Sequence, residues 1–487
     1  MRHFGKLLAA LLIAAFFGGC AQPAAEGNFK RGLNDYAFTA ASLSAVDREN
    51  RTIAPMYAEK TDKVRYVGVF YWLWMGNNDH QFGVYDVTKL LSTPEGEQAL
   101  FQTVNPPGDG MENASPLDYM HWTNEPMLGY YNSSDPWVIA RHIEMLTLAD
   151  VDFIFFDATN YYTYAVNHSQ QPEGGKIKGA GMAVLDTLLE YYDQGWDVPK
   201  VAFYTNSCSG DRVQEIFDAY YRSGKYEDLW FKPEGKPLII GTTENNGGGS
   251  DMDPDDPSKY NNISPALQEY FDVKESQWPT SRNYENGWPW IDWTRPQHVY
   301  GAGEETVMNV STGQHNRLPF SDAVLADKTY KGEELMDTMW GRGYTTEDGP
   351  DHSDEAVRSG KNFEEQWQNA INADPKYTFV TGWNEWCALK SIGQPGNGEY
   401  FTAGNYNRPY FVDTFNEEFS RDVEMVKNGY GDNAFLQLMR NVRNYKGNKV
   451  TELPYGSVKS IDIEKGLTQW NAVSSVYFDL TGETNRN

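Results

Sequence analysis

Residues 377–386 read Tyr-Thr-Phe-Val-Thr-Gly-Trp-Asn-Glu-Trp. A short run of strand-forming residues ends at Gly382, and a carboxylate, Glu385, follows directly between Trp383 and Trp386. Reactive groups gather at the carboxyl ends of the strands in parallel α/β proteins. The stretch therefore predicts a buried strand that ends in a functional acid, whose pKa would be raised by partial desolvation among the indoles. The alternative is a buried glutamate in an ion pair beside core tryptophans.

Apolar runs of the same kind recur along the chain and alternate with amphipathic segments. We expect strands at residues 64–72, 151–156, 200–205, 237–240, 306–310 and 377–381, and helices at residues 137–150, 181–193, 211–223, 363–373, 415–425 and 433–445. This alternation is typical of a parallel sheet covered by helices. At this length it favours a (β/α)8 barrel, a TIM barrel with long βα loops, over an open doubly wound sheet.

Four segments are expected along the chain. Residues 1–19 are a predicted signal peptide, and residues 20–60 are a polar tether that leads into the domain. The barrel is expected over residues 61–448. Residues 449–487 form a short β-rich tail, which either packs on the barrel or is the truncated part of an accessory domain.

The N-terminal residues predict export. Arg2 and Lys6 precede an apolar stretch over residues 7–17, and Gly18-Gly19-Cys20 follows. The stretch is shorter than the roughly 20 apolar residues that a membrane span needs. Its ending resembles a bacterial lipoprotein signal, in which Cys20 would become the lipidated first residue. The expected location is the bacterial cell envelope, with a lipid anchor in the outer membrane on its periplasmic or surface face.

The charge of the chain excludes one class of partner. It carries 41 Lys and Arg against 68 Asp and Glu, a formal net charge of −27. This field repels nucleic acid, so we expect neither DNA nor RNA binding. Cys208 and Cys387 are the two remaining cysteines after Cys20, and the sequence leaves open whether they pair.

No cofactor or metal is expected. The first predicted strand is not followed by Gly-x-Gly-x-x-Gly, and the chain has no phosphate-loop, His-Glu-x-x-His or Gly-x-Ser-x-Gly motif. Residues 251–255 resemble the opening of a calcium loop, but Asp256 and Asn262 stand where an EF-hand needs Gly and Glu. A solvated surface insertion is the favoured interpretation, and a loose calcium site is the alternative.

Asp157 is the second predicted catalytic residue, because it ends the buried run Phe153-Ile154-Phe155-Phe156. Other polar and aromatic residues follow predicted strands or lie in the loop over residues 121–131, and we expect them to bind substrate. They are Tyr71, Trp72, His121, Trp122, Glu125, Tyr131, Asn160, Tyr204, Asn206, His315, Trp383, Asn384 and Trp386. A purely structural role is the alternative for each of them. The 15 tryptophans of the chain supply platforms on which sugar rings could stack, as well as core.

The segments at residues 67–72, 153–157 and 381–386 together resemble the glycoside hydrolase family 71/99-like group, which includes endo-α-mannosidases. The resemblance implies a (β/α)8 barrel over roughly residues 60–448, and its specific part is Asn384-Glu385-Trp386. In the endo-mannosidases the motif continues with His and Glu, and its two glutamates act as base and acid. Here Cys387 and Ala388 occupy those two positions, so the acid of the family is missing.

Glycoside cleavage normally needs two carboxylates, and the partner of Glu385 must therefore come from another loop. Asp157 is the first choice, Glu125 the second and Asp413 the third. Lys390 is either an exposed lysine, which is favoured, or a group that binds an anionic sugar.

The sequence predicts an exported, lipid-anchored glycosidase with a carbohydrate substrate and Glu385 as its acid/base residue. A surface glycan-binding protein that lost catalysis at Ala388 is the main alternative, and a polysaccharide lyase is the third.

Overall fold

The structure is a computed structural model of the whole chain. It describes residues 45–53, 63–76, 82–101, 114–159, 179–206, 208–243, 261–279, 281–316, 318–324, 329–330, 333–334, 339–392 and 409–446. Cys20, Asn160, the aspartates at residues 251–255 and the tail at residues 449–487 lie outside these ranges, so what we expected of them stays a prediction.

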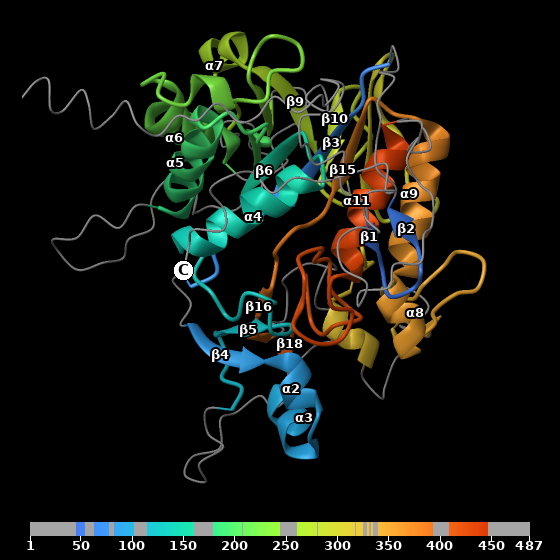
Figure 1. The fold of residues 1–487 in the computed structure, drawn as a ribbon. Coiled ribbons are helices and arrows are strands. Elements are labelled where there is room, and N and C mark those ends of the chain that lie inside the picture. Colours follow the sequence, from blue (N-terminus) through green and yellow to red (C-terminus); the bar gives the residue numbers. More distant parts are fainter. Residues whose placement is uncertain are drawn as a thin grey trace, which may run out of the picture.

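A nine-stranded sheet forms the centre of the described chain, in the order β10-β9-β8-β7-β6-β3-β15-β12-β11 (Figure 1). Its strands are β3 (Tyr66–Tyr71), β6 (Phe153–Ala158), β7 (Lys200–Thr205), β8 (Leu238–Gly241), β9 (Asp272–Gln277), β10 (Gly287–Pro289), β11 (Tyr300–Ala302), β12 (Glu305–Val310) and β15 (Tyr377–Val380). Every neighbouring pair is parallel except the β11–β12 hairpin. The parallel strands follow one another in chain order around the sheet, and the last, β15, pairs with the first, β3.

The sheet curls into a nearly closed barrel. β10 and β12 lie side by side without a backbone ladder between them. Side chains bridge this seam, because Asn309 Nδ2 and Thr381 Oγ1 both donate to the carbonyl of Trp290, at 2.9 and 2.5 Å. The predicted barrel sheet is therefore present, with one seam held by side chains.

Helices cover most of the outside of the barrel (Figure 1). They are α4 (Pro136–Leu148), α5 (Ala180–Asp193), α6 (Ser209–Ile216) with a π-helical turn (Phe217–Tyr221), α7 (Pro265–Tyr270), α8 (Asp354–Ser359), α9 (Lys361–Ala373) and α11 (Asn433–Tyr445), with 3-10 turns at Glu227–Leu229 and Phe320–Val324. Asp135 caps α4, since its carboxylate accepts from the backbone N–H groups of Trp137 and Val138. The described residues between β9 and β12 form no helix, so this layer has fewer helices than a complete (β/α)8 barrel.

Alternate side chains of the strands enter two separate cores. Phe70, Phe155 and Phe379 point into the barrel, where aromatic residues fill the space. Val69 and Val380 point outward and pack under the helices. The barrel is therefore filled by large rings, which leaves chemistry to its rim.

A small sheet lies beyond the carboxyl ends of the barrel strands, together with two short helices (Figure 1). Its strands are β4 (Phe82–Asp86), β5 (Met120–Trp122) and β16 (Cys387–Leu389), and α2 (Val87–Leu91) and α3 (Pro94–Phe101) follow β4. The remaining described strands form two-stranded ladders: β1 (Ala45–Val46) with β2 (Thr52–Ile53), β13 (Thr329–Tyr330) with β14 (Glu333–Glu334), and β17 (Ser391–Ile392) with β18 (Pro409–Tyr410).

The helix expected at residues 415–425 is wrong. This segment is irregular, because its backbone bonds to the loop after β15: Val423 donates to the carbonyls of Gly382 and Trp383, and Glu424 to that of Trp383. Strands β9 and β10 were not predicted, since β9 reads Asp-Val-Lys-Glu-Ser-Gln and lacks an apolar run.

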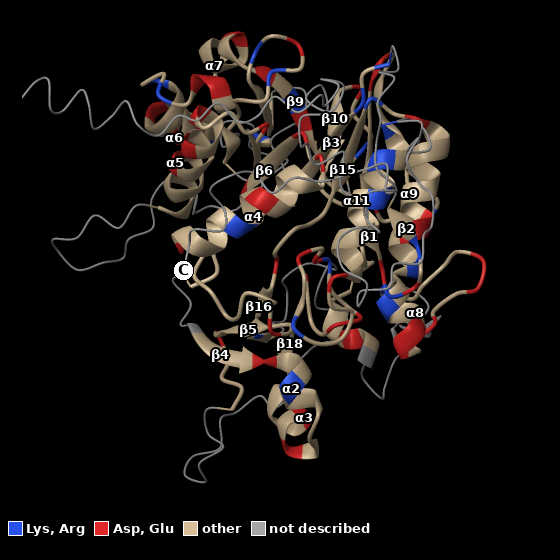
Figure 2. Cartoon of the chain, viewed as in Figure 1, with Lys and Arg blue, Asp and Glu red and all other residues tan. Residues whose placement is uncertain are grey.

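Cys208 and Cys387 are both free thiols. In the described part of the chain, no helix combines the length and hydropathy of a membrane span. In the view of Figure 2, acidic residues lie on several helices around the barrel, among them α4, α6, α7 and α8.

Candidate active site

Glu385 lies in a loop that is fixed to the end of the first barrel strand. Trp383 donates its backbone N–H to the carbonyl of Phe70 at 2.8 Å. The Asn384 side chain accepts from the backbone N–H of Trp72 at 2.9 Å and donates to its carbonyl at 3.1 Å. Gly382 is required here, because a Cβ at this position would lie 1.8 Å from the Trp72 ring. Asn384, predicted to bind substrate, instead holds the loop that carries Glu385.

Arg421 joins two carboxylates. Its Nε and Nη2 both donate to Glu385 Oε2, at 3.2 and 2.7 Å, and Nη2 also lies 3.0 Å from Asp413 Oδ1. His315 Nε2 lies 3.4 Å from the same Asp413 oxygen. Glu385 is only 3% exposed, whereas the Asp413 side chain is 36% exposed. Of the three partners considered for Glu385, the structure brings Asp413 into direct contact with the same guanidinium.

Asp157 lies near the end of β6 and faces the same cluster. Its Oδ1 accepts from the backbone N–H and the hydroxyl of Thr159, at 3.0 and 2.7 Å. The charge of Asp413 is close enough to raise the pKa of Asp157 further. We call these three acids the carboxylate cluster: Glu385 and Asp413, which share Arg421, and Asp157, whose pKa the charge of Asp413 affects.

Each acid of the carboxylate cluster is held through one oxygen only. Arg421 occupies Oε2 of Glu385, Arg421 and His315 face Oδ1 of Asp413, and Thr159 occupies Oδ1 of Asp157. The described residues offer no hydrogen bond to the other oxygen of any of the three. A carboxyl that is oriented on one side and free on the other is ready to give or take a proton.

The surroundings separate the pKa values of the three acids. Burial raises the pKa of Glu385 well above its ordinary value, and the ion pair with Arg421 offsets this only in part. Burial also raises the pKa of Asp157. Although burial opposes it, the charge of Arg421 and the neighbouring His315 lower the pKa of Asp413 to about 2. Burial therefore favours the protonated form of the enclosed Glu385, and Arg421 favours the ionised form of Asp413.

Three half-buried indoles stand beside this cluster and were missed from the sequence. Trp278 and Trp290 follow directly after β9 and β10, and their rings stack at 4.8 Å and 17°. The Arg421 guanidinium lies over the Trp290 ring, 5.2 Å from its centroid. Trp293 makes an edge contact with His315 at 6.1 Å. The signal was present in the dense run Trp288-Pro-Trp290-Ile-Asp-Trp293, which lies outside any predicted strand.

The aromatic residues that we predicted to bind substrate are part of the core. None of the following is more than 7% exposed: Tyr71, Trp72, Trp122, Tyr131, Tyr204, Trp383 and Trp386. Tyr204 donates its hydroxyl to the carbonyl of Trp288 at 2.6 Å. Asn206, also predicted to bind substrate, accepts from the Ser276 hydroxyl at 2.9 Å. These contacts stabilise the barrel rim.

A second buried glutamate, Glu424, has both oxygens occupied. His142 Nε2 lies 2.9 Å from Oε1, while Tyr131 and Trp386 donate to Oε2 at 2.7 and 2.5 Å. Tyr71 orients the histidine through a 2.8 Å bond to Nδ1. This network ties the residue after Glu385 to α4 and the loop before it, and it leaves no oxygen free for substrate.

Two other candidates lie away from the carboxylate cluster. Glu125 forms ion pairs of 2.7 Å with both Lys89 and Lys427. His121 bonds to Ser115 and to the carbonyl of Tyr119, and its burial lowers its pKa to about 3. Glu125 and His121 therefore stabilise the small sheet and its surroundings.

Lys390, favoured as an exposed lysine, is in fact buried. Its ammonium donates to the carbonyls of Ala99 and Ser115 at 2.7 and 2.6 Å, and to the Ser115 hydroxyl. Ala388 is fixed in β16, opposite His121 of β5, and brings no carboxylate.

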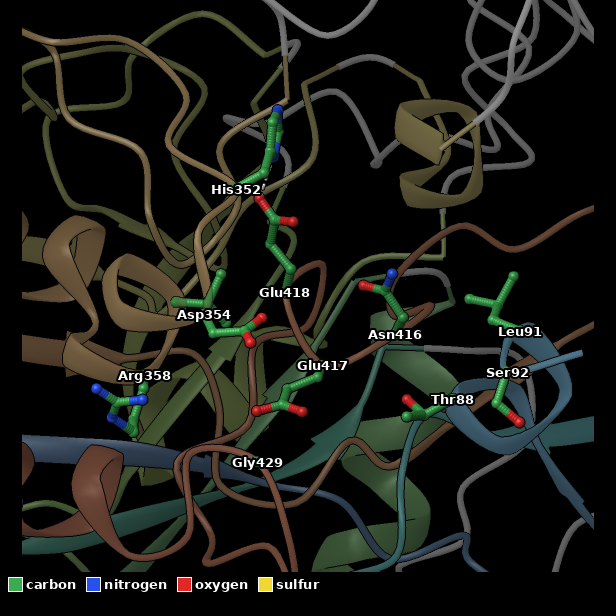
Figure 3. Close-up of a pocket in the computed structure, with 11 residues that line it drawn as sticks. Thr88, Leu91, Ser92, His352, Asp354, Arg358, Asn416, Glu417, Glu418 and Gly429 are labelled. Carbon is green, nitrogen blue, oxygen red and sulfur yellow. Dashed lines mark hydrogen bonds and ion pairs between the residues drawn. The ribbon is translucent and has the colours of Figure 1, made fainter.

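The described residues also line a groove of about 480 Å³, which is separate from the carboxylate cluster (Figure 3). Leu91 and Ser92 from the end of α2 form one wall, and Asp354 and Arg358 of α8 form the other. His352 and Glu418 form an ion pair at its edge, 2.5 Å apart. Among the described residues that line the groove there is no Phe, Tyr or Trp, the side chains on which sugar rings usually stack.

No protein-family model matches the chain, and no curated protein matches it. Among solved structures, the chain is similar to a GH99 endo-alpha-mannosidase from Bacteroides thetaiotaomicron, with 14% identity, a TM-score of 0.39, and coverage of 79% of this chain and 98% of that one. A second structure of that enzyme, in complex with bis-tris-propane, gives 13% identity, a TM-score of 0.38 and the same coverage. A glycoside hydrolase-like protein gives 12% identity and a TM-score of 0.29, over 84% of this chain and 99% of that one. Similarity at this level assigns neither a family nor an activity to the chain.

Proposed function

We propose that this chain is a glycoside hydrolase that cleaves glycosidic bonds in an external polysaccharide or glycan. The carboxylate cluster carries the proposal, because each of its three acids is held through one oxygen and the other oxygen has no hydrogen-bond partner among the described residues. It lies at the carboxyl ends of the parallel strands, beside half-buried indoles. Glycoside hydrolysis needs one protonated and one ionised carboxyl group, and the separated pKa values of Glu385 and Asp413 provide that pair.

Glu385 is the general acid. Its Oε2 is fixed by Arg421, and its Oε1 carries the proton that passes to the leaving glycosidic oxygen as the C–O bond breaks. Arg421 stays charged throughout, because it also neutralises Asp413. After the proton has left, the same guanidinium stabilises the Glu385 carboxylate.

Asp413 is the ionised partner. Its free Oδ2 either takes a proton from the attacking water or attacks the anomeric carbon itself. The exposure of its side chain gives water access to this oxygen. Asp157, which the sequence favoured for this role, is the alternative partner, and its raised pKa leaves it ionised over a narrower pH range than Asp413.

The indoles beside the cluster define the substrate class. The C–H face of a sugar ring packs on an aromatic face, and Trp278 and Trp293 offer partly exposed rings next to the carboxylate cluster. We place the chain in the (β/α)8 class on the parallel sheet. Export and a lipid anchor at Cys20 remain part of the proposal on the evidence of the N-terminal sequence.

A panel of glycans tests the proposal, with release of reducing ends as the readout. Wild type should cleave at least one glycan, and Glu385→Gln should lose on the order of 10²- to 10⁴-fold in rate. Glu215→Gln on the surface of α6 is the matched control and should behave as wild type. Equal rates for wild type and Glu385→Gln would overturn the assignment.

A glycan-binding protein without catalysis is the second candidate, because Ala388 brings no acid and Glu385 is ion-paired with Arg421. It predicts measurable affinity for a glycan, no turnover on any member of the panel and no effect of Asp157→Asn on binding. Products that absorb in the ultraviolet would instead reveal a polysaccharide lyase.

A further inference from the structure

Asp422 is a buried acid directly behind the carboxylate cluster, and the proposed reaction does not use it. The backbone around it is fixed, since Arg421 accepts from the N–H of Gly382 at 3.0 Å and Val423 donates to the Gly382 carbonyl at 3.1 Å. The Asp422 side chain is 0% exposed. It lies close enough to Glu385 for the charge of each to affect the other.

Neither carboxylate oxygen of Asp422 has a well-formed hydrogen bond among the described residues, and the backbone N–H of Glu385 lies near enough to lower the pKa of Asp422. The charged and titratable groups that face it are Arg342, Arg421, Glu385, Glu424, Cys387 and Tyr430. Arg342 is occupied elsewhere, because it donates to backbone carbonyls, including that of Asp422 at 2.6 Å, and to the Ser420 hydroxyl.

An ionised carboxylate without hydrogen bonds is unfavourable in such a place, whereas a protonated one is tolerated. In agreement with this, burial raises the pKa of Asp422 to about 7, and Glu424 adds to the effect.

We propose that Asp422 is a positioning residue for Glu385: it holds a proton behind the site, and its ionisation keeps the proton of Glu385 in place. Ionisation releases one proton from Asp422 to solvent and leaves one negative charge beside Glu385. This charge opposes a second ionisation nearby, so Glu385 stays protonated to higher pH than it would alone. The catalytic meaning of the proposal rests on the role of Glu385 as acid in the proposed function.

Asp422→Asn removes the carboxyl group of Asp422 with little change in the shape of the side chain, so the titration of Glu385 can be measured without it. Carboxyl-¹³C NMR on Asp- and Glu-labelled protein gives the protonation of each acid directly, without substrate. In wild type, one Asp signal should titrate at about pH 7, and that signal should be absent from the variant. The Glu385 signal should titrate at lower pH in Asp422→Asn than in wild type. Asp218→Asn on the surface is the control and should leave both signals unchanged. A Glu385 titration that is identical in wild type and Asp422→Asn would overturn the proposal.

Unfolding by urea gives a second readout. The folded state binds a proton at Asp422 that the unfolded chain releases at about pH 4, so wild-type stability falls as pH rises from about 4 to about 7. Asp422→Asn lacks this fall. As pH rises from about 4 to about 7, the unfolding equilibrium constant of wild type should increase about a thousandfold relative to that of the variant. A constant ratio would overturn the proposal.

If Asp422→Asn does not fold, the proposal can be tested on the wild-type chain alone. Its infrared spectrum should lose a protonated-carboxyl band between about pH 6 and pH 8, and a spectrum without such a change would contradict the proposal. These measurements use no glycan, so they separate the two claims. If the Glu385 titration depends on Asp422 but no glycan is cleaved, the proposed function fails and this inference stands. If a glycan is cleaved but the rate falls at the same alkaline pH in wild type and Asp422→Asn, this inference fails and the proposed function stands.

Discussion

Glu385 lies in the loop after β15, and Glu424 lies in the segment that bonds to this loop. Both glutamates are buried, but they differ in how many of their carboxylate oxygens are hydrogen-bonded. Glu424 accepts bonds from Tyr131 and Trp386 and lies against His142, so both of its oxygens are used. Glu385 is bonded by Arg421 through Oε2 alone. Burial is common to the two acids and therefore does not mark the functional one. Under the proposed function, the mark is the oxygen that has no hydrogen-bond partner among the described residues.

The same difference separates the carboxylate cluster from the rest of the rim. A fully bonded buried acid stabilises its neighbours, and removing it leaves their donors without partners. A partly bonded acid stabilises less and can exchange a proton with substrate or water. Substitutions at single residues test whether this difference in hydrogen bonding sets the role of each acid.

Asp413→Asn should reduce kcat/KM for a cleaved glycan by about 10³-fold, because it removes the ionised carboxylate and keeps its size. Steady-state kinetics on the glycan found by the panel measures this. Asp218→Asn, whose partner Arg222 is exposed, serves as the control and should match wild type. A loss of less than tenfold in Asp413→Asn would move the role of partner to Asp157.

Glu424→Gln should destabilise the fold by about 2–3 kcal/mol, since its amide would place a donor against the donors that now bond to the carboxylate. Urea unfolding followed by tryptophan fluorescence measures the change. Glu227→Gln, which affects only a surface pair with Lys232, should change stability by less than about 0.5 kcal/mol. Equal stability of Glu424→Gln and wild type would contradict the network.

Asp413 should also contribute to the resistance of the fold to acid. Its pKa is lowered to about 2 in the folded chain, so its contribution to stability is present above about pH 4 and is lost as pH falls towards 2. Its side chain is 36% exposed, and solvent screening reduces the contribution to the order of 1 kcal/mol. Urea unfolding of wild type and Asp413→Asn at pH 7 and pH 3 measures it. A stability difference that does not shrink on acidification would be inconsistent with an ionised Asp413.

Trp278→Ala should raise KM by about tenfold and change kcat little, because stacking holds the sugar equally before and during the reaction. Trp196, which is 40% exposed after α5, supplies the control Trp196→Ala. An unchanged KM in Trp278→Ala would remove the indole from the substrate site.

Much of the barrel could be predicted from the sequence, because apolar runs such as Phe153–Ala158 can only be buried strands. Strand β9 could not be predicted, since its sequence Asp-Val-Lys-Glu-Ser-Gln has no apolar run, and its position between β8 and β10 makes it a strand. The segment at residues 415–425 has enough apolar spacing for a helix, but its backbone bonds to the loop after β15. Tertiary contacts decide both cases.

The site was predictable in part for the same reason. Glu385 and Asp157 each end a predicted strand, and a strand end is visible in the sequence. Arg421 lies 36 residues from Glu385 in a segment without a motif, so only the folded chain shows that it joins Glu385 to Asp413. The aromatic residues near predicted strand ends entered the core, and the half-buried indoles follow two strands that the sequence did not show.

The most direct test of the account compares Glu385→Gln with Glu424→Gln in glycan cleavage, with rates expressed per folded molecule. The account predicts that Glu385→Gln stays folded and loses about 10²- to 10⁴-fold in rate. It predicts that Glu424→Gln is less stable but retains a rate within about tenfold of wild type once folded. The reverse pattern, or equal losses in the two variants, would contradict the claim that the free oxygen marks the functional acid.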